Sequence, residues 1–478
     1  MKNFSRPASD LRAVVVGAGM AGMLGAAVLA KHGAKVTVLE RDVLPAGPEP
    51  RKAIPQARHV HVLWTGGITA FEAILPGITQ QWVDAGARRI SLPTDLVTMT
   101  ARGWIPRWAE MKFNVACSRD LLDWVVRQRV LKEFPDITVL DRHAVQGLAG
   151  TADQVTGVHV ADGHRAVRTL DADLVLDCSG RGSRAVQWLG ELGVPEAGVV
   201  EVDSGLVYAS RLFEAPRDTN GNPVTDLPIV NVQSNPSDPV PGRTATIVPI
   251  EGGRILGTLS GTYGGQPTSS PDEFVPFAQS LRHSVVGDLM AGLVPVDDTV
   301  TVTHSTLNRR RLFEKSPMPR GFIAVGDSVA TFNPLYGQGM TVAAQGLVAL
   351  DQLLGQHGLT GRVLTRRAQK AIGRRAAVAY ELASSQDILY PEATGRKPPF
   401  GSGLVNWYVN RLMYTATTEP AAARAFLGVI TMSEAPTAWL RPATVATVLR
   451  GPRISAVPDG PPITGQERRV FDRQPVSR

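Results

Sequence analysis

The chain is poor in cysteine and has one long uncharged stretch near its start, and both features limit what it can be. Cys117 and Cys178 are its two cysteines in 478 residues, and they lack the spacing of metal ligands. This argues against a disulfide framework and favours a reducing, cytoplasmic setting. Residues 13–30 carry no charge, but their four glycines favour a turn over a membrane span. We therefore expect no stable membrane insertion.

Aromatic residues are also scarce and do not interleave with the basic runs, which weighs against nucleic-acid binding. Aromatics make up 6% of the chain, and its 50 basic residues divide into 9 Lys and 41 Arg, against 43 acidic residues. The short basic runs at 309–311 and 374–375 contain no aromatics and are typical of solvated faces or ion pairs. A hydrophobic content of 43% and a charged content of 19% describe a globular, enzyme-like protein of two or three domains.

The first forty residues predict a strand, a glycine turn, a helix and a second strand. The run 13–16 is apolar and β-branched, residues 17–22 match G-x-G-x-x-G, and an Ala-rich stretch leads to a second strand that ends in Glu40. Gly17 permits the tight turn, Gly19 lets the backbone approach a pyrophosphate, and Gly22 lets helix and strand pack closely. Glu40 follows Gly22 by 18 residues, where an acid can bond a ribose. The pattern predicts a dinucleotide site.

Two later strands end in loops typical of ligand sites in α/β proteins. Residues 174–176 run into Asp177-Cys178-Ser179-Gly180, and residues 322–325 run into Gly326-Asp327. Between them, residues 201–261 alternate in polarity and predict an antiparallel sheet in a second domain. Helical patterns extend to about Leu449, and the Pro-rich end from Gly451 is expected to be flexible.

Polar side chains in two other segments are ligand candidates, each with a structural alternative. The loop 41–58 holds Arg51, Lys52 and Gln56, and a basic surface loop is the alternative reading. Arg119 begins a helix that Ser118 is expected to cap, a position the helix dipole disfavours for a cation. It therefore indicates a ligand or a surface ion pair. His59 and His61 lack the further ligands that zinc requires.

These stretches together resemble flavoprotein monooxygenases of the para-hydroxybenzoate hydroxylase and squalene epoxidase type. The shared motifs are residues 17–40, the strand ending in 177–180, and Gly326-Asp327 followed by Pro334-x-x-Gly337-x-Gly339. The resemblance implies an α/β fold: a Rossmann-like FAD-binding domain of the glutathione reductase type, an antiparallel-sheet substrate domain and C-terminal helices. It implies FAD contacts from Gly17, Gly19, Met20, Ala21, Gly22, Glu40, Arg41, Arg51, Lys52, Gln56, Arg119, Gly326, Asp327, Pro334, Gly337, Gly339 and Met340.

On this basis the domains are expected to be discontinuous. The FAD-binding domain takes residues 1–87, 116–190 and 301–360, and the substrate domain takes residues 88–115 and 191–300. Residues 361–450 form a C-terminal helical region, and 451–478 form a flexible tail. Trp104 and Trp108 are candidates for the substrate pocket, with ordinary core packing as the alternative.

Within that family the chain is most similar to bacterial polyether epoxidases, through residues 51–64, 116–123 and 333–340. The resemblance implies epoxidation of polyene polyketide alkenes by O2 through C4a-hydroperoxyflavin. No catalytic side chain is assigned, because alkene epoxidation needs no triad or carboxylate pair. The alternatives are an FAD-dependent hydroxylase of another natural product, an alkene reductase resembling geranylgeranyl reductase, and a flavin-binding protein without turnover.

Three departures from the family motifs bear on the electron donor and the reaction. Ser179-Gly180 stands where the hydroxylases carry Asp-Gly, and a second G-x-G-x-x-G is missing. Reduction of FAD by NAD(P)H directly or through a separate flavin reductase therefore stays open. Residues 103–106 match part of a halogenase W-x-W-x-I-P motif, but Arg102 replaces its first Trp, which argues against halogenation.

Overall fold

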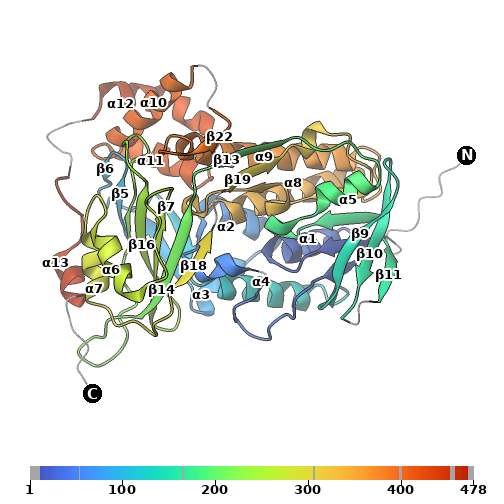
Figure 1. Ribbon diagram of the computed structural model, residues 1–478, viewed down its shortest axis with the longest axis horizontal. Coiled ribbons are helices and arrows are strands. Elements are labelled where there is room, and N and C mark those ends of the chain that lie inside the picture. Colours follow the sequence, from blue (N-terminus) through green and yellow to red (C-terminus); the bar gives the residue numbers. More distant parts are fainter. Residues whose placement is uncertain are drawn as a thin grey trace, which may run out of the picture.

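The computed structural model describes residues 11–52, 54–163, 166–304, 307–397, 401–452 and 458–471. A five-stranded parallel sheet forms the core of one half of the molecule, to the right in Figure 1. Apart from the edge strand 138–140, its strands are largely buried apolar runs, as expected for a sheet covered on both faces. In spatial order they are β20 (Phe322–Ala324), β12 (Leu174–Asp177), β1 (Arg12–Val16), β2 (Lys35–Leu39) and β8 (Thr138–Leu140).

Helices and a small antiparallel sheet pack around this core. Helix α1 contacts both α4 and α8, and α8 contacts α9. The bounds of these helices are α1 (Met20–Lys31), α4 (Arg119–Glu133), α8 (Gly339–His357) and α9 (Leu364–Asp387). The small sheet has the order β11-β10-β9, and α5 (Ala185–Glu191) contacts it. Its strands are β9 (Ala144–Gly150), β10 (Val155–Ala161) and β11 (Val167–Asp171). The predicted α/β fold with a Rossmann-like core is confirmed.

A seven-stranded sheet forms the other half of the molecule, to the left in Figure 1. Its strands are antiparallel except for the parallel pair β5 and β15. In spatial order they are β18 (Thr301–His304), β14 (Val207–Glu214), β17 (Arg254–Gly261), β16 (Arg243–Ile250), β15 (Ile229–Val232), β5 (Leu96–Thr100) and β6 (Gly103–Trp104). Helices α6 (Pro271–Gln279) and α7 (Val285–Ala291) pack on it. The predicted domain boundaries stay predictions.

Two smaller sheets and a helix pair make up further parts of the described fold. One sheet has the order β3-β7-β4 and the other β21-β19-β13-β22. Their strands are β3 (Val62–Trp64), β4 (Arg88–Leu92), β7 (Lys112–Ala116), β13 (Val199–Asp203), β19 (Leu307–Arg311), β21 (Ala330–Thr331) and β22 (Thr394–Gly395). Helix α2 (Thr65–Ile74) contacts both α8 and α3 (Ile78–Asp84).

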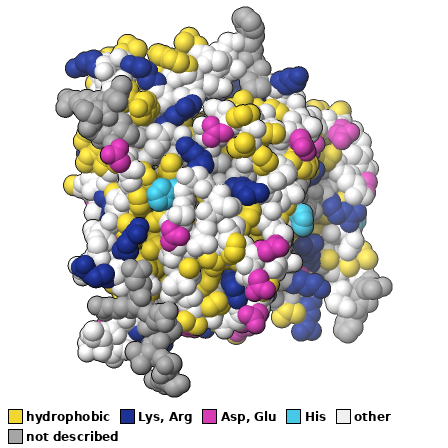
Figure 2. Space-filling model, turned by 60° about the vertical axis from the view of Figure 1, so that its left-hand side comes forward, with side chains coloured by type: hydrophobic (Ala, Val, Ile, Leu, Met, Phe, Trp, Pro, Cys, Tyr) yellow, Lys and Arg dark blue, Asp and Glu magenta, His cyan; other side chains and the backbone are white. Residues whose placement is uncertain are grey.

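The C-terminal helices form a separate small cluster, here called the C-terminal cap (residues 402–450). It comprises α10 (Ser402–Thr415), α11 (Pro420–Ile430), the 3₁₀ turn η7 (Pro436–Leu440) and α12 (Pro442–Arg450), at the upper left of Figure 1. Leu412, Val429 and Trp439 are buried in its own apolar core. Several of its apolar side chains are exposed, among them Leu404 at 73% and Leu440 at 66%. Figure 2, which turns this side of the molecule forward, shows hydrophobic and basic side chains interspersed on one face.

The chain beyond the cap departs from the expected flexible tail. Residues 453–457 and 472–478 lie outside the described part, but α13 (Gly465–Phe471) lies within it. Phe471 is 1% exposed and joins the core of the seven-stranded half, and Glu467 forms an ion pair with Arg107 at 2.7 Å. Apolar burial and this pair hold the segment. Across the described residues, no helix combines the length and apolarity needed to cross a bilayer.

Candidate functional site

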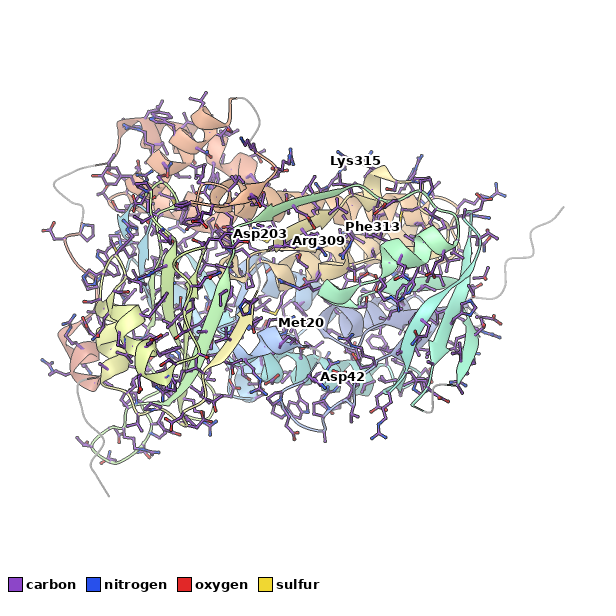
Figure 3. All side chains as sticks on the ribbon, viewed as in Figure 1. Met20, Asp42, Asp203, Arg309, Phe313 and Lys315 are labelled. Carbon is purple, nitrogen blue, oxygen red and sulfur yellow. The ribbon has the colours of Figure 1, made fainter. Side chains whose placement is uncertain are left out.

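A cavity of about 750 Å³ lies at the carboxyl ends of the parallel strands, where α/β proteins bind ligands. Met20, in the first turn of α1, lies between the two large sheets (Figure 3). All the predicted site residues except Gly22 line the cavity. They are Gly17, Gly19, Met20, Ala21, Glu40, Arg41, Arg51, Lys52, Gln56, Arg119, Gly326, Asp327, Pro334, Gly337, Gly339 and Met340.

The glycines of the first turn have separate structural roles. Gly17 has a φ of 97°, and a Cβ there would lie 2.7 Å from the Cys178 carbonyl oxygen. A Cβ on Gly22 would lie 1.8 Å from the Gly17 oxygen, so Gly22 supports the turn from behind. A Cβ on Gly19 would meet no atom within 4 Å, because this residue faces the open cavity. Among the described residues no side chain caps α1, and its first turn holds no acid, which leaves its N-terminal amides available to an anion.

Glu40 is held at the end of β2 by a buried ion pair with Arg51. Glu40 Oε2 accepts hydrogen bonds from the Ala18 amide at 2.9 Å and from Arg51 Nη2 at 2.5 Å. The side chains of Arg51 and Glu40 are 5% and 6% exposed. Arg51 Nη1 donates to the Ala18 carbonyl, and Arg51 Nε is buried with no partner among the described residues. The pair fixes the acid beside the glycine turn and leaves one buried donor at the cavity.

The loops after β12 and β20 form the next part of the wall. Asp177 is fully buried and accepts hydrogen bonds from Ser179 and Ser183, which fixes the first loop. Gly180 N donates to Ser328 Oγ at 3.1 Å and so joins this loop to the second. Asp327 lies in the second loop, where burial raises the pKa of its carboxyl, although nearby arginines oppose the effect.

The loop 333–340 is anchored by a buried polar cluster around Asp387. Asn333 Oδ1 accepts from Tyr208 OH at 2.7 Å, and Asn333 Nδ2 donates to both oxygens of Asp387 at 3.1 and 2.9 Å. Asn308 Nδ2 and Tyr336 OH also donate to Asp387, at 2.6 and 3.2 Å. Burial raises the pKa of Asp387 to about 6. Residues from β14, β19 and α9 thus hold this loop in place.

A second cavity, of about 1220 Å³, lies on the other side of the loop 333–340. Trp64 separates the two: its Nε1 donates to the Tyr336 carbonyl at 2.9 Å and lies 2.8 Å from where a Gly337 Cβ would be. Gln338 lines both cavities. The wall of the second cavity is largely apolar and includes Leu96, Ile105, Leu335, Val378, Leu404, Trp407, Phe426, Leu427, Ile430 and Trp439. The C-terminal cap supplies much of it.

The contacts of Arg119, His59 and His61 show which neighbours these candidate ligand-binding side chains have. Arg119 lines the first cavity and also pairs with Asp123, Nε to Oδ1 at 2.7 Å, while Ser118 caps α4 as predicted. His61 lines the first cavity, and burial together with Arg119 lowers its pKa to about 3. His59 bonds Ser210 Oγ at 2.7 Å. Nowhere in the described residues do three or more His, Cys, Asp or Glu form a group that could hold a metal.

Of the aromatic candidates for a substrate pocket, Trp104 is a core residue and Trp108 is half-buried. Trp104 is 3% exposed and packs edge-on against His283, and Trp108 packs against the core of the cap. The sequence did not reveal that the C-terminal cap lines a cavity, because apolar residues recur with the same helical period whether they face a core or a cavity. It also missed one end of the first cavity, which is lined by His143, Ala144, Val145, Gln146, Arg181, Arg184 and Trp188. No motif marks these residues.

Comparisons with known proteins agree with the fold. Residues 13–187 match the family model described as FAD dependent oxidoreductase. The chain is 28% identical to Protein Rv3254 of Mycobacterium tuberculosis over 87% of this chain and 88% of that one. It is 27% identical to a kynurenine 3-monooxygenase of Salinispora tropica over 72% of this chain and 73% of that one. The structure of a triple mutant of the flavin-dependent brominase Bmp2 aligns with a TM-score of 0.60 at 12% identity, over 92% of this chain and 99% of that one.

Residues 13–187 therefore carry the sequence features of FAD dependent oxidoreductases, and the chain has the fold of solved flavin-dependent halogenases and monooxygenases. FAD is its cofactor, and the first cavity fits that group. The free amides of α1 and the open space at Gly19 suit a pyrophosphate, while Glu40 and the unpartnered Arg51 Nε suit polar groups of a nucleotide.

Proposed function

We propose that this chain is a monooxygenase that epoxidises alkenes of an apolar polyketide intermediate, of the type found in polyether biosynthesis. The observation that carries the proposal is the pair of cavities that meet at the loop 333–340. One has the features of a dinucleotide site, and the other offers about 1220 Å³ of largely apolar space. An apolar chain moved from water into such a space gains about 0.8 kcal/mol for each buried methylene group.

The residues that line the first cavity, with Gly22 behind the turn, would hold FAD. The α1 amides and Gly19 would take the pyrophosphate, Glu40 the ribose, and Asp327 the ribityl or pyrophosphate region. The backbone of 334–340 would contact the flavin ring. Bound FAD supplies the redox chemistry and the reaction with O2, and the chain's own contribution is to bind, orient and exclude water. Trp64 and Tyr336 form the partition against which the alkene would lie.

Oxygen transfer is tested with the FAD-loaded protein, a reductant, a linear polyene polyketide and ¹⁸O₂. The proposal predicts one ¹⁸O atom in each epoxide formed, with the second atom in water. Saturation of the alkene under anaerobic conditions, with no label incorporated, would instead establish the alkene reductase. Comparing NADPH alone with NADPH plus a separate flavin reductase, under the same conditions, identifies the electron donor.

Hydroxylation of an aromatic natural product is the second candidate, and two observations favour it. One is the similarity to kynurenine 3-monooxygenases. The other is the Tyr336–Asp387 pair, because Tyr336 lines the apolar cavity and Asp387 behind it could accept a proton. Phenol hydroxylation gains from such a base, whereas alkene epoxidation does not. A hydroxylase therefore predicts that Asp387→Asn lowers kcat many-fold, and an epoxidase predicts only a small change.

A further inference from the structure

His61 directly precedes β3, and the main chain fixes which of its ring nitrogens carries the proton. The residue lines the first cavity but not the second. Its Nδ1 donates to the carbonyl oxygen of His59 at 2.9 Å. Because a carbonyl oxygen can only accept, Nδ1 must carry the proton, and Nε2 therefore carries a lone pair. His61 thus presents a hydrogen-bond acceptor on a ring that is held in one orientation.

This acceptor is open to the cavity. His61 is half-buried, and its Nε2 has no hydrogen-bond partner among the described residues. His59 provides the contrast: its Nε2 also lacks a partner there, but it is fully enclosed, and its ring lines neither cavity. The Nε2 of His61 is not enclosed in this way. A molecule that enters the first cavity can therefore reach it.

The surroundings of His61 keep its ring neutral and its lone pair available. Burial, with a smaller contribution from the positive charge of Arg119, lowers the pKa of His61 to about 3. Arg119 lines the same cavity, and its Nε is already paired with Asp123 at 2.7 Å. A cofactor that fills the cavity displaces the water that would otherwise solvate Nε2, and an acceptor left without a donor is unfavourable. The bound group must therefore supply a donor at this position.

The neighbours of His61 indicate which half of FAD lies beside it. Val62 Cγ2 is 3.5 Å from where a Cβ on Gly337 would lie, and Trp64 Nε1 donates to the Tyr336 carbonyl at 2.9 Å. Strand β3 thus lies against the loop 333–340, whose backbone the proposed function assigns to the flavin ring. The ring carries an N–H group and the ribityl chain carries hydroxyls, so this half of the cofactor offers donors.

We propose that His61 Nε2 accepts a hydrogen bond from the flavin half of FAD, from the ring N–H or a ribityl hydroxyl, and so helps to hold the ring against the loop 333–340. This contact lies outside the glycine motifs and the loops after β12 and β20. It goes beyond the proposed function in one respect, because it does not depend on which reaction the flavin performs. It needs only FAD in the first cavity with its ring at this loop.

Two substitutions separate the two ring nitrogens. His61→Gln places an oxygen near the position of Nε2 and keeps the acceptor, whereas His61→Asn keeps a donor near the position of Nδ1 and loses the acceptor. Titration calorimetry of each apoprotein measures the dissociation constants of FAD and of ADP, which has the adenosine and pyrophosphate groups but no ribityl chain or flavin. We expect His61→Asn to bind FAD roughly three- to tenfold more weakly than the wild type, the range for one neutral hydrogen bond, and to bind ADP equally well. His61→Gln should bind both as the wild type does.

His59→Asn is the matched control, the same substitution two residues earlier. The His59 ring bonds Ser210 Oγ at 2.7 Å and lines neither cavity, so both dissociation constants should stay unchanged. His61→Leu, which removes the donor and the acceptor, should weaken FAD binding as His61→Asn does, and it replaces that variant if the latter does not fold.

Three results would overturn the proposal. The first is wild-type FAD affinity in His61→Asn and His61→Leu. The second is a His61→Gln variant that binds FAD as weakly as His61→Asn, because the bond to the His59 carbonyl would then be what matters. The third is an equal loss of FAD and ADP affinity, which would show that His61 serves the adenosine half or the general shape of the cavity. Each of these results is independent of the ¹⁸O experiment, so a failure of oxygen transfer leaves the assignment of His61 standing.

Discussion

The buried carboxyl of Asp387 lowers the stability of the folded protein when it is ionised, and a single substitution should remove this effect. Its carboxyl is fully buried at the last residue of α9, where the helix dipole also disfavours a negative charge. Burial raises its pKa from 3.8 to about 6. A folded-state pKa above the unfolded one means that the native state binds the proton more tightly. Stability is therefore greatest at low pH and declines as pH rises from about 4 to about 6.

The loss of stability follows from the difference between the folded and unfolded pKa values of Asp387. Above pH 6 the ionised carboxylate costs about 3 kcal/mol of unfolding free energy relative to the protonated form. Asp387→Asn should avoid this cost and keep the cluster satisfied. Its one oxygen can accept from Asn308 and Asn333, and its amide group can donate to Tyr336, whose hydroxyl reverses its role. Asp387→Ala leaves the same three donors unpaired, each at about 1–3 kcal/mol.

The assay is the thermal midpoint of both variants and the wild type between pH 5 and 8, each with FAD bound. We expect the thermal midpoint of Asp387→Asn to lie a few degrees above that of the wild type at pH 8. At pH 5 this difference should be roughly 2 °C smaller, since a change of about 1 kcal/mol in the free energy of unfolding shifts the midpoint of a protein of this size by about 1–2 °C. Asp387→Ala should melt below both. An Asn variant that is less stable than the wild type by the same amount at every pH would refute the reasoning.

Three predictions concern the glycine turn and the loop after β20. Gly19→Ala should fold with a wild-type thermal midpoint as apoprotein and yet bind FAD at least tenfold more weakly by fluorescence titration, because its Cβ enters the space reserved for the cofactor. Gly22→Ala should fail to give soluble protein, since its Cβ would lie 1.8 Å from the Gly17 oxygen, and recovery of a stable holoprotein would count against this packing. Asp327→Ala should purify mostly without FAD while Asp327→Asn retains part of it, as judged by the ratio of flavin to protein absorbance.

The sequence allowed the strand-and-turn skeleton to be predicted because local signals determine it. The run ending at Val16, the glycine turn and the acid at Glu40 occur in the order that a nucleotide-binding unit needs, and the structure has them as β1, α1 and β2. The seven-stranded sheet was predictable for the same reason: residues 201–261 were expected to form an antiparallel sheet, and β14, β15, β16 and β17 lie within that range. Period-two alternation between turns is a strong signal when one face of a sheet is buried.

Long-range partners of polar residues were not predictable in this way. Asp387 was simply part of a helix, and its contacts come from Asn308 and Asn333, which are 79 and 54 residues distant. The position of Arg119 in the first turn of α4 indicated a ligand or an ion pair. The structure shows that it both pairs with Asp123 and lines the first cavity. A side chain's pairing depends on which elements meet in space, and no local periodicity encodes that.

The loop 333–340 shows why the substrate side of the site was the harder half to predict. Gly337 has a φ of 63° and a Cβ there would lie 2.8 Å from Trp64 Nε1, while Gly339 lines the first cavity, so backbone requirements make both glycines part of a recognisable motif. Other side chains of the loop contact elements distant in sequence: Tyr336 contacts α9, and Gln338 contacts the cap through Ile430. Cofactor chemistry is shared across a fold, whereas substrate chemistry is specific to each protein. On the proposed function, the part of the loop that a motif captures is the part that faces FAD, and substrate choice is expected to reside in the residues between the glycines.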